Sequence, residues 1–220
     1  MTGPHTERAS RGVLAELRDF VPIRPLTRTE AYRIAEMQAT RFLRMVGADT
    51  PPVREEVISE LPRIHVQRFS PLPVSGATQW SHGRWMILLN GAEPVVRQRF
   101  SLAHEFKHIL DHRFIDILYQ RIPDAERHEF IEGVCDYFAG CLLVPRAWLK
   151  RAWGDGIQQP AALAARFGVS QQAIQVRLSQ VGLGERPARC SRIAPNWALP
   201  WQRAAGTRKE YHRFAVATST

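Results

Sequence analysis

The sequence contains few cysteines and no long apolar run, and these absences exclude several classes of protein. Three cysteines in 220 residues cannot form the disulfide framework on which many small secreted proteins depend. No apolar stretch reaches the roughly 20 residues of a membrane span, and residues 1–20 contain no apolar signal core. The chain is therefore expected to be cytoplasmic, in a reducing compartment, without association with a membrane.

Acidic residues are scarce in the last third of the chain. Residues 1–144 carry 18 basic and 18 acidic side chains, whereas residues 145–220 carry 12 basic and 3 acidic ones. The net charge of +9 therefore arises entirely after residue 144. A basic segment of this kind indicates contact with nucleic acid or with an acidic partner. The alternative is a basic tail that has no dedicated partner.

The central motif is a His-Glu-x-x-His run at residues 104–108. Apolar residues recur every three or four positions over residues 96–114, which predicts a half-buried helix. Residues four apart are neighbours on a helix, so His104 and His108 can bind one metal ion, with Glu105 beside them as a proton acceptor. A chance occurrence in a polar helix is the alternative, but the neighbouring apolar positions place both histidines beside the core.

A third metal ligand has to come from another part of the chain. His112 extends the histidine spacing, but on a continuous helix it lies about 12 Å from His104 along the axis. Zinc–nitrogen bonds are only about 2.0–2.1 Å long, so one ion cannot bind both side chains. We therefore interpret His112 as a pocket-lining or structural residue.

A second predicted helix, at residues 125–143, offers two carboxylates. Its apolar stripe indicates that part of its surface is buried, and Glu132 and Asp136 lie one turn apart on one face. Glu132 can complete a His2Glu site for Zn²⁺, and Asp136 can accept the free ring N–H of a ligating histidine. A solvated acidic face is the alternative, but the flanking residues are apolar and buried carboxylates need partners.

Residues 97–145 resemble the ImmA/IrrE family of zinc metallopeptidases. The matching text is Arg-Gln-Arg-Phe-Ser-Leu-Ala-His-Glu-x-x-His at residues 97–108 and Glu-x-x-Cys-Asp-x-Phe-Ala-x-x-Leu-Leu-Val-Pro at residues 132–145. The resemblance implies a thermolysin-like site, with a glutamate on a second helix as the third ligand. The sequence departs from the family pattern at Cys135, where alanine is usual, and at Lys107, where glycine is common. We expect Lys107 to point to solvent.

The expected fold is α+β, a mostly helical zincin-like metallopeptidase with a small sheet, followed by a helix-turn-helix segment. Further helices are predicted at residues 28–45, 53–61 and 147–153, and strands at residues 64–69, 78–80 and 85–89. A capping box formed by Thr27 and Glu30 begins the first of these helices. By analogy, the edge strand of such a sheet can hold an extended peptide by strand addition.

Four parts are expected along the chain. They are a flexible N-terminal tail at residues 1–24, a zinc metallopeptidase domain at 25–158, a helix-turn-helix segment at 159–184 packed on it, and a basic C-terminal tail at 185–220. In the third part, Gly168 ends one helix and Ser170 caps the next.

The helix-turn-helix segment has two interpretations. In the first, the second helix faces a DNA groove or a partner protein. The side chains available for such contacts are Gln171, Gln172, Gln175 and Arg177. In the second, the segment is a packing module that only completes the peptidase, as the family resemblance also implies. We favour the second interpretation.

The expected site supports peptide hydrolysis. Zinc held by His104, His108 and Glu132 would keep one position for water and lower the pKa of that water, and Glu105 would take its proton and pass it to the leaving amine. A further donor must stabilise the oxyanion. The candidates, among which the sequence does not choose, are His112, Tyr119, His128 and Tyr137.

Two classes of function follow from these observations. The first is a zinc endopeptidase whose substrate, as the resemblance implies, is a helix-turn-helix transcriptional repressor; cleavage would release gene expression in response to stress or on a mobile element. The second is a DNA-binding or partner-binding transcriptional regulator with a non-catalytic metal site. The intact Glu105 favours the first class, because a purely structural metal site has no use for a base.

Overall fold

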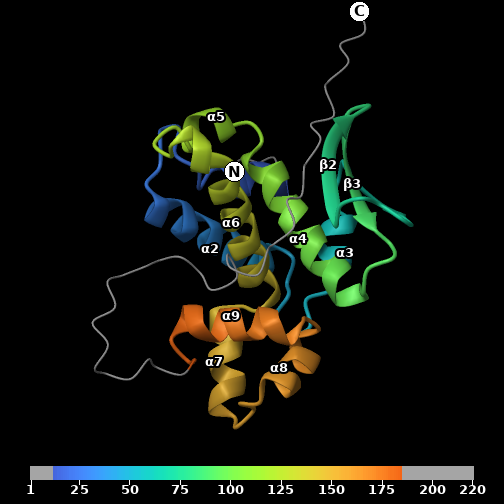
Figure 1. The fold of residues 1–220 in the computed structure, drawn as a ribbon, viewed down its shortest axis with the longest axis vertical. Coiled ribbons are helices and arrows are strands. Elements are labelled where there is room, and N and C mark those ends of the chain that lie inside the picture. The colour runs from blue at the N-terminus through green and yellow to red at the C-terminus, as the bar shows by residue number, and fades with distance from the viewer. Residues whose placement is uncertain (1–11, 185–220) are drawn as a thin grey trace, which may run out of the picture. The chain divides into compact units, whose positions relative to one another are not determined.

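The computed structural model describes residues 12–184, and these residues form the expected mostly helical α+β fold (Figure 1). The elements in chain order are α1 (Val13–Arg18), α2 (Arg28–Met45), α3 (Glu56–Ser59), β1 (Ile64–Phe69), β2 (Gly76–Ser81), β3 (Arg84–Asn90), α4 (Val95–Asp111), α5 (Ile115–Leu118), α6 (Asp124–Leu143), α7 (Arg146–Gly154), α8 (Pro160–Phe167) and α9 (Gln171–Val181). Within this part of the chain, no helix combines the length and apolarity needed to cross a membrane. The basic tail predicted at 185–220 lies outside the described residues.

A small three-stranded sheet stands beside the helices, in the order β1-β3-β2. Strand β3 pairs in parallel with β1 and antiparallel with β2. Alternate residues of β3 are buried, namely Trp85, Ile87 and Leu89, so one face of the sheet packs on the protein interior. Within the described residues, β2 is an edge strand whose outer side has no strand partner.

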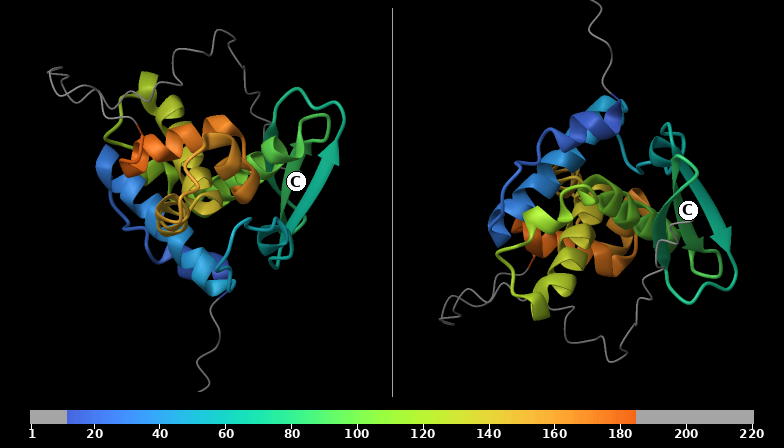
Figure 2. Two further views of the ribbon diagram at one scale, coloured as in Figure 1. Left: turned by 90° about the horizontal axis from the view of Figure 1, so that it is seen from below. Right: turned by 90° about the horizontal axis from the view of Figure 1, so that it is seen from above.

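Helix α4 lies between the sheet and α6, as the views in Figures 1 and 2 agree. Helix α2 packs against α6. Aromatic contacts join the three helices: the ring centroids of Phe42 and Phe106 are 5.0 Å apart, and those of Phe106 and Phe138 are 6.1 Å apart. This apolar core holds α4 and α6 side by side.

Two glycines allow α6 to pack closely on its neighbours. A Cβ atom at Gly133 would lie 3.3 Å from the Tyr32 hydroxyl of α2, and one at Gly140 would lie 3.1 Å from Cδ of Arg177 in α9. Each of these distances is tighter than an ordinary van der Waals contact, so a larger residue would push the neighbouring side chain away. The close packing that these glycines allow compensates for their low helix propensity.

Several predicted boundaries of helices and strands are confirmed, and one predicted helix is shorter than expected. Helix α2 spans residues 28–45 as predicted, and its capping box is present: the Thr27 hydroxyl accepts from the Glu30 N–H, and the Glu30 carboxylate accepts from the Thr27 N–H. Strand β1 also has its predicted bounds. The helix predicted at 53–61 is reduced to the four residues of α3.

The N-terminal boundary differs from the prediction. We expected residues 1–24 to form a flexible tail, but α1 begins at Val13 and the side chain of Leu17 is fully buried. Arg18 donates through Nη2 to the carbonyl oxygen of Ile109 in α4, at 2.7 Å. Residues 12–24 are therefore a packed part of the fold, because apolar burial and this hydrogen bond attach them to the central helices.

Candidate metal and catalytic site

The paired histidines lie on the face of α4 that points toward α6. His104 and His108 are half-buried and one helical turn apart, and their Nε2 atoms are 3.1 Å apart. The surrounding positions Ala103 and Phe106 are fully buried, so the apolar stripe that packs α4 on the core also sets the direction of the two imidazoles.

The carboxylate of Glu132 on α6 contacts both imidazoles. Its Oε2 lies 3.3 Å from Nε2 of His104, and its Oε1 lies 3.3 Å from Nε2 of His108. Burial disfavours the ionised form of Glu132, but the bonds to the two histidines outweigh it and hold the pKa of the carboxyl below its ordinary value. The three side chains thus bring two nitrogen donors and one negative charge to a single point.

Asp136 fixes the orientation of one of these imidazoles. Nδ1 of His104 donates to Oδ1 of Asp136 across 2.8 Å, which leaves Nε2 directed at Glu132. Burial disfavours a charged imidazole, but the carboxylates of Asp136 and Glu132 outweigh it and raise the pKa of His104 to about 10. A site with this excess of negative charge favours occupation by a cation.

The spacing of the donor atoms fits tetrahedral zinc. Ligand atoms of a regular tetrahedron with bonds of about 2.0–2.1 Å are about 3.3–3.4 Å apart. The nitrogen–nitrogen distance of 3.1 Å and the nitrogen–oxygen distances of 3.3 Å lie close to that value. Two imidazoles and one carboxylate also form a donor set that zinc binds in hydrolytic enzymes.

Cys135 offers a competing third ligand, because its sulfur and one nitrogen of each histidine all lie within 4.8 Å of one another. Its side chain is buried, and burial raises the pKa of the thiol well above its ordinary value. A protonated thiol is a poor ligand, since the thiolate is the form that binds metals. Glu132, which contacts both nitrogens directly, is the better third donor.

Glu105 lies between α4 and the edge strand of the sheet. Thr78 of β2 donates through its hydroxyl to Oε2 of Glu105 at 2.6 Å. A Cβ atom at Gly76 would lie 3.0 Å from Oε1 of Glu105, so the missing side chain at this position leaves room for the carboxylate. Nothing in the sequence identifies Thr78 as a residue of the site, because only the packing of β2 on α4 brings it to Glu105.

The four candidate oxyanion donors are placed very differently. Tyr119 is 1% exposed and its hydroxyl donates to Oδ2 of Asp111 at 2.6 Å, so a substrate cannot reach it and this assignment is corrected. Tyr137 is directed at α2, where its hydroxyl donates to Glu36 Oε2 at 3.2 Å. The other two candidates lie nearer the surface.

His112 is exposed, and its ring packs edge-to-face on Trp85 with 4.8 Å between centroids. His128 is also exposed and lies one turn before Glu132 on α6. Residues four apart share a face of a helix, so His128 is on the same side of α6 as Glu132 and Asp136. Of the four candidates, His128 is thereby the one whose helix face carries the site.

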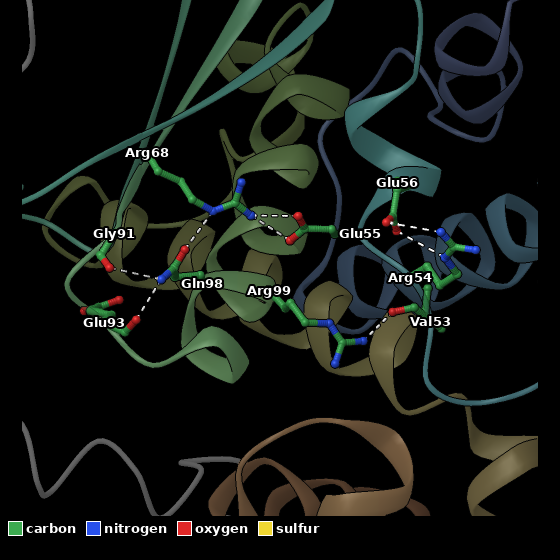
Figure 3. Close-up of polar contacts among 9 residues, drawn as sticks. All are labelled: Val53, Arg54, Glu55, Glu56, Arg68, Gly91, Glu93, Gln98 and Arg99. Carbon is green, nitrogen blue, oxygen red and sulfur yellow. Dashed lines mark hydrogen bonds and ion pairs between the residues drawn. The ribbon is translucent and has the colours of Figure 1, made fainter.

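Polar contacts attach the first turns of α4 to the rest of the protein (Figure 3). The amide of Gln98 accepts from Nε of Arg68 in β1 at 2.8 Å and donates to the carbonyl oxygen of Glu93 at 2.7 Å. Arg68 also donates through Nη2 to both carboxylate oxygens of Glu55. These bonds fix α4 relative to the sheet. They thereby also fix the position of Glu105, a residue of α4, next to β2.

Arg99 extends the same attachment to the helix-turn-helix segment. Its guanidinium donates to the carbonyl oxygen of Val53 (Figure 3) and to that of Gly168. Gly168 has a φ of +61°, and a Cβ atom there would collide with the guanidinium of Arg99. The turn between α8 and α9 therefore needs glycine for its backbone and for this contact.

Lys107 does not point to solvent, and this expectation is wrong. Its side chain is 1% exposed, and its ammonium group donates to Oδ1 of Asp111 at 2.6 Å and to Oε1 of Gln38 at 2.7 Å. Gln38 in turn donates to the carbonyl oxygen of Leu17. The lysine is therefore the centre of a buried polar network that joins α1, α2 and α4.

Substitution of Lys107 by methionine is expected to lower the free energy of unfolding by about 3–5 kcal/mol, because it leaves the Asp111 carboxylate buried without a positive partner. Denaturation in urea measures this change, with Lys150→Met as a matched control at an exposed position. A loss of less than about 1 kcal/mol would show that Tyr119 alone satisfies the carboxylate.

The helix-turn-helix geometry is confirmed in α8 and α9. Gly168 adopts the left-handed conformation at the end of α8, and the Ser170 hydroxyl accepts from the Ala173 N–H at 3.1 Å to begin α9. The glutamines predicted to face DNA or a partner are exposed on α9: Gln171, Gln172 and Gln175.

Arg177 does not belong to the exposed contact surface, so the prediction is wrong for this residue. The side chain is 2% exposed, Nε donates to the carbonyl oxygen of Val144 at 3.2 Å, and the guanidinium lies 5.5 Å from the ring centroid of Tyr137. It shares the buried stripe of α9 with Ile174 and Leu178. That three- and four-residue spacing is the sequence signal that would have identified Arg177 as a packing residue.

Comparison with known proteins places this arrangement in context. The sequence profile of Peptidase_M78, described as the IrrE N-terminal-like domain, matches residues 62–179, more than half of the chain. A search of curated proteins gives no significant match. Among solved structures, a Mycobacterium tuberculosis transcriptional regulator shares the fold with a TM-score of 0.54 and 20% sequence identity, covering 81% of this chain and 54% of that one. The chain thus spans about half the length of that regulator.

Proposed function

The chain belongs to the Peptidase_M78 family of IrrE N-terminal-like domains, and on this premise we propose that it is a zinc-dependent endopeptidase that cleaves a helix-turn-helix transcriptional repressor. The observation that carries the proposal is the meeting of three donor side chains beside a separate carboxylate. His104, His108 and Glu132 converge within 3.3 Å of one another. Glu105 follows His104 on α4, and its carboxylate bonds to Thr78 and not to that cluster. A site that only stabilised the fold would not need the second carboxylate.

The side chains divide the chemistry among themselves. His104, His108 and Glu132 would hold the ion, which when bound lowers the pKa of water and polarises a carbonyl group. Glu105 accepts a proton from the attacking water and returns it to the leaving amine. The Thr78 hydroxyl donates to Oε2 of Glu105, which orients the carboxylate and leaves Oε1 as the proton acceptor.

We assign the oxyanion donor to His128. It is the exposed candidate on the face of α6 that carries Glu132 and Asp136, so an imidazole there can reach a peptide carbonyl bound over the site. A donor aimed at the developing negative charge is commonly worth about a hundredfold to a thousandfold in kcat. The buried hydroxyl of Tyr119 has no route to a substrate.

The edge of β2 that has no strand partner among residues 12–184 suits an extended peptide. The N–H of Asn90 donates to the carbonyl oxygen of Ser75, so odd-numbered residues of this strand bond to β3. Gly76, Thr78 and Trp80 therefore direct their backbone N–H and C=O groups away from β3. A substrate chain that adds to this edge would pass directly above the Thr78–Glu105 contact.

A repressor is proposed as the substrate because the family resemblance implies it, and because a structure with the same fold is described as a transcriptional regulator. Cleavage of such a repressor would release gene expression during stress or from a mobile element. The partner would meet the protease near DNA, where the basic last third of the chain, with 12 basic and 3 acidic residues, favours association.

Purified protein is expected to cleave a helix-turn-helix repressor encoded beside its gene into defined fragments. Mass spectrometry of the fragments identifies the bond that is cut. The chelator 1,10-phenanthroline should stop the reaction, its non-chelating 1,7 isomer should not, and added zinc should restore it. Cleavage that persists in the chelator, or that the 1,7 isomer inhibits equally, would contradict metal dependence.

A DNA-binding regulator is the second candidate function, and α8 and α9 favour it because they form a helix-turn-helix unit. The exposed face of α9 weakens it. That face carries the amides of Gln171, Gln172 and Gln175, while its arginine, Arg177, is buried. Without phosphate contacts from this helix, most of the affinity that DNA-binding proteins obtain from electrostatics is missing there.

Substitution of Gln171 and Gln172 by alanine should therefore lower the rate of repressor cleavage and leave DNA binding unaltered. Any binding of duplex DNA should be sequence-blind and should weaken steeply with salt, as expected for the basic chain end. Fluorescence anisotropy with a specific and a scrambled duplex measures both properties. Tight, sequence-specific binding that the two substitutions relax would instead establish the regulator.

A further inference from the structure

An aromatic ladder extends from the edge strand to the end of the histidine-bearing helix. The rings of Trp80 in β2 and Trp85 in β3 meet edge-to-face with 5.2 Å between centroids. Trp85 in turn meets His112, at the end of α4, with 4.8 Å between centroids. Trp85 supports both of the other rings, because it is buried whereas Trp80 is 50% exposed and His112 is exposed as well.

Trp80 lies on the helix-facing side of the sheet. Its cross-strand neighbour Trp85 belongs to the buried face of β3, and side chains of directly opposed residues point to the same face. Thr78, two residues earlier, is on that same face and contacts Glu105. Successive residues on one face of a strand are about 6.8 Å apart. Trp80 is therefore the next residue on this face after Thr78, which contacts Glu105.

The exposure of Trp80 is unusual for a residue in this position. A large aromatic side chain on the inner face of a sheet normally gains stability by complete burial. Trp80 instead packs on a second tryptophan and leaves half of its surface exposed, beside a strand edge that no other strand of residues 12–184 covers. The fixed, uncharged ring therefore provides apolar area at low entropic cost to a chain that binds along β2.

We propose that Trp80, supported by Trp85 and His112, forms a specificity subsite for one large apolar or aromatic side chain of the substrate. The inference rests on the proposed function, since it places the substrate along β2 above Glu105. An extended peptide paired with β2 directs alternate side chains to the helix-facing side of the sheet. One of these substrate side chains contacts the Trp80 ring. It lies two residues along the substrate from the residue that is bound beside Glu105.

Cleavage of a proteome-derived peptide mixture tests the subsite. The wild-type protein should cut where a Phe, Leu, Met, Tyr or Trp occupies one fixed position relative to the scissile bond. Trp80→Ala should lower kcat/KM for such a peptide by about tenfold or more and leave the alanine-substituted peptide unaffected, because only the ring–side chain contact is lost. Trp80→Phe should restore most of the preference.

Phe69→Ala is the matched control. Phe69 is 46% exposed and belongs to β1, at the opposite edge of the sheet, so its removal should leave the preference unchanged. An unchanged preference in Trp80→Ala, or an equal loss in Phe69→Ala, overturns the proposal.

Peptide binding separates the subsite from the catalytic function. A random dodecapeptide phage library is selected on the full chain carrying Glu105→Gln, with and without Trp80→Ala. The selected peptides should share a large apolar residue that disappears with Trp80→Ala. Such a result without any cleavage by the wild-type protein would reject the proposed peptidase and retain the subsite; selection without an apolar preference, or no selection at all, rejects the subsite.

Discussion

Replacement of Glu105 by glutamine is expected to lower repressor cleavage by about a thousandfold or more while leaving the fold and the bound zinc intact. The amide has nearly the shape of the carboxylate, and its oxygen can still accept the hydrogen bond from Thr78, which spans 2.6 Å in the native protein. It cannot accept a proton from water. The loss should therefore appear in kcat, and zinc content should stay unchanged.

Glu60→Gln is the control for this substitution, because Glu60 is exposed at the end of α3 and has no part in the site. Zinc content, measured by atomic emission, and the far-ultraviolet circular dichroism spectrum should match the native protein for both variants. A Glu105→Gln protein that cut its substrate at a near-native rate would remove Glu105 as the general base and reassign the proton transfer to another group.

The sequence predicts well the parts of this fold that depend on local signals. The capping box of Thr27 and Glu30 and the apolar periodicity behind it predict the bounds of α2 at both ends. The four-residue spacing of His104 and His108 predicts their contact, because helix geometry alone brings them together. The pairing of this helix with α6 requires an apolar surface on each helix, and apolar residues at three- and four-residue spacing predict both surfaces.

Predictions that depend on distant partners are less successful. Lys107 is a charged residue on a helix, so exposure is the reasonable expectation, and only Gln38 of α2 and Asp111 together make its burial possible. Tyr119 is a polar aromatic residue that the sequence leaves available for catalysis, and only the structure shows that its hydroxyl donates a hydrogen bond to Asp111. Sequence gives the chemistry of such groups, whereas tertiary packing decides which partners they meet.

The contrast between local sequence signals and contacts with distant partners also applies inside the site. Glu132 was inferred from its place on a half-buried helix, and in the structure its carboxylate contacts both histidines. The contact of Thr78 with Glu105 had no comparable signal, since a threonine in a short strand has many ordinary roles. Its position follows from the order β1-β3-β2, which brings β2 next to α4.

The second large effect that we expect is the loss of zinc binding when a ligand is substituted. Native protein is expected to bind about one zinc ion per chain, and Glu132→Ala or His104→Ala should weaken zinc binding by well over a hundredfold, because loss of a hydrogen-bonding partner of a ligand alone costs about 10–100-fold. In the native protein Glu132 contacts both Nε2 atoms at 3.3 Å, so its removal leaves the two imidazoles without the third donor of the site. Competition with a chromogenic chelator measures the affinity of each variant.

Two further variants make this result specific to the assigned ligands. Glu129→Ala removes an exposed glutamate from the same helix and should leave zinc binding unchanged. Cys135→Ser removes the competing donor, which lies within 4.8 Å of both histidines, and should also retain the metal because the buried thiol stays protonated. Full zinc occupancy in Glu132→Ala, combined with loss of zinc in Cys135→Ser, would assign the third ligand to the cysteine; full occupancy in both would direct attention to Asp136, whose carboxylate lies 2.8 Å from Nδ1 of His104.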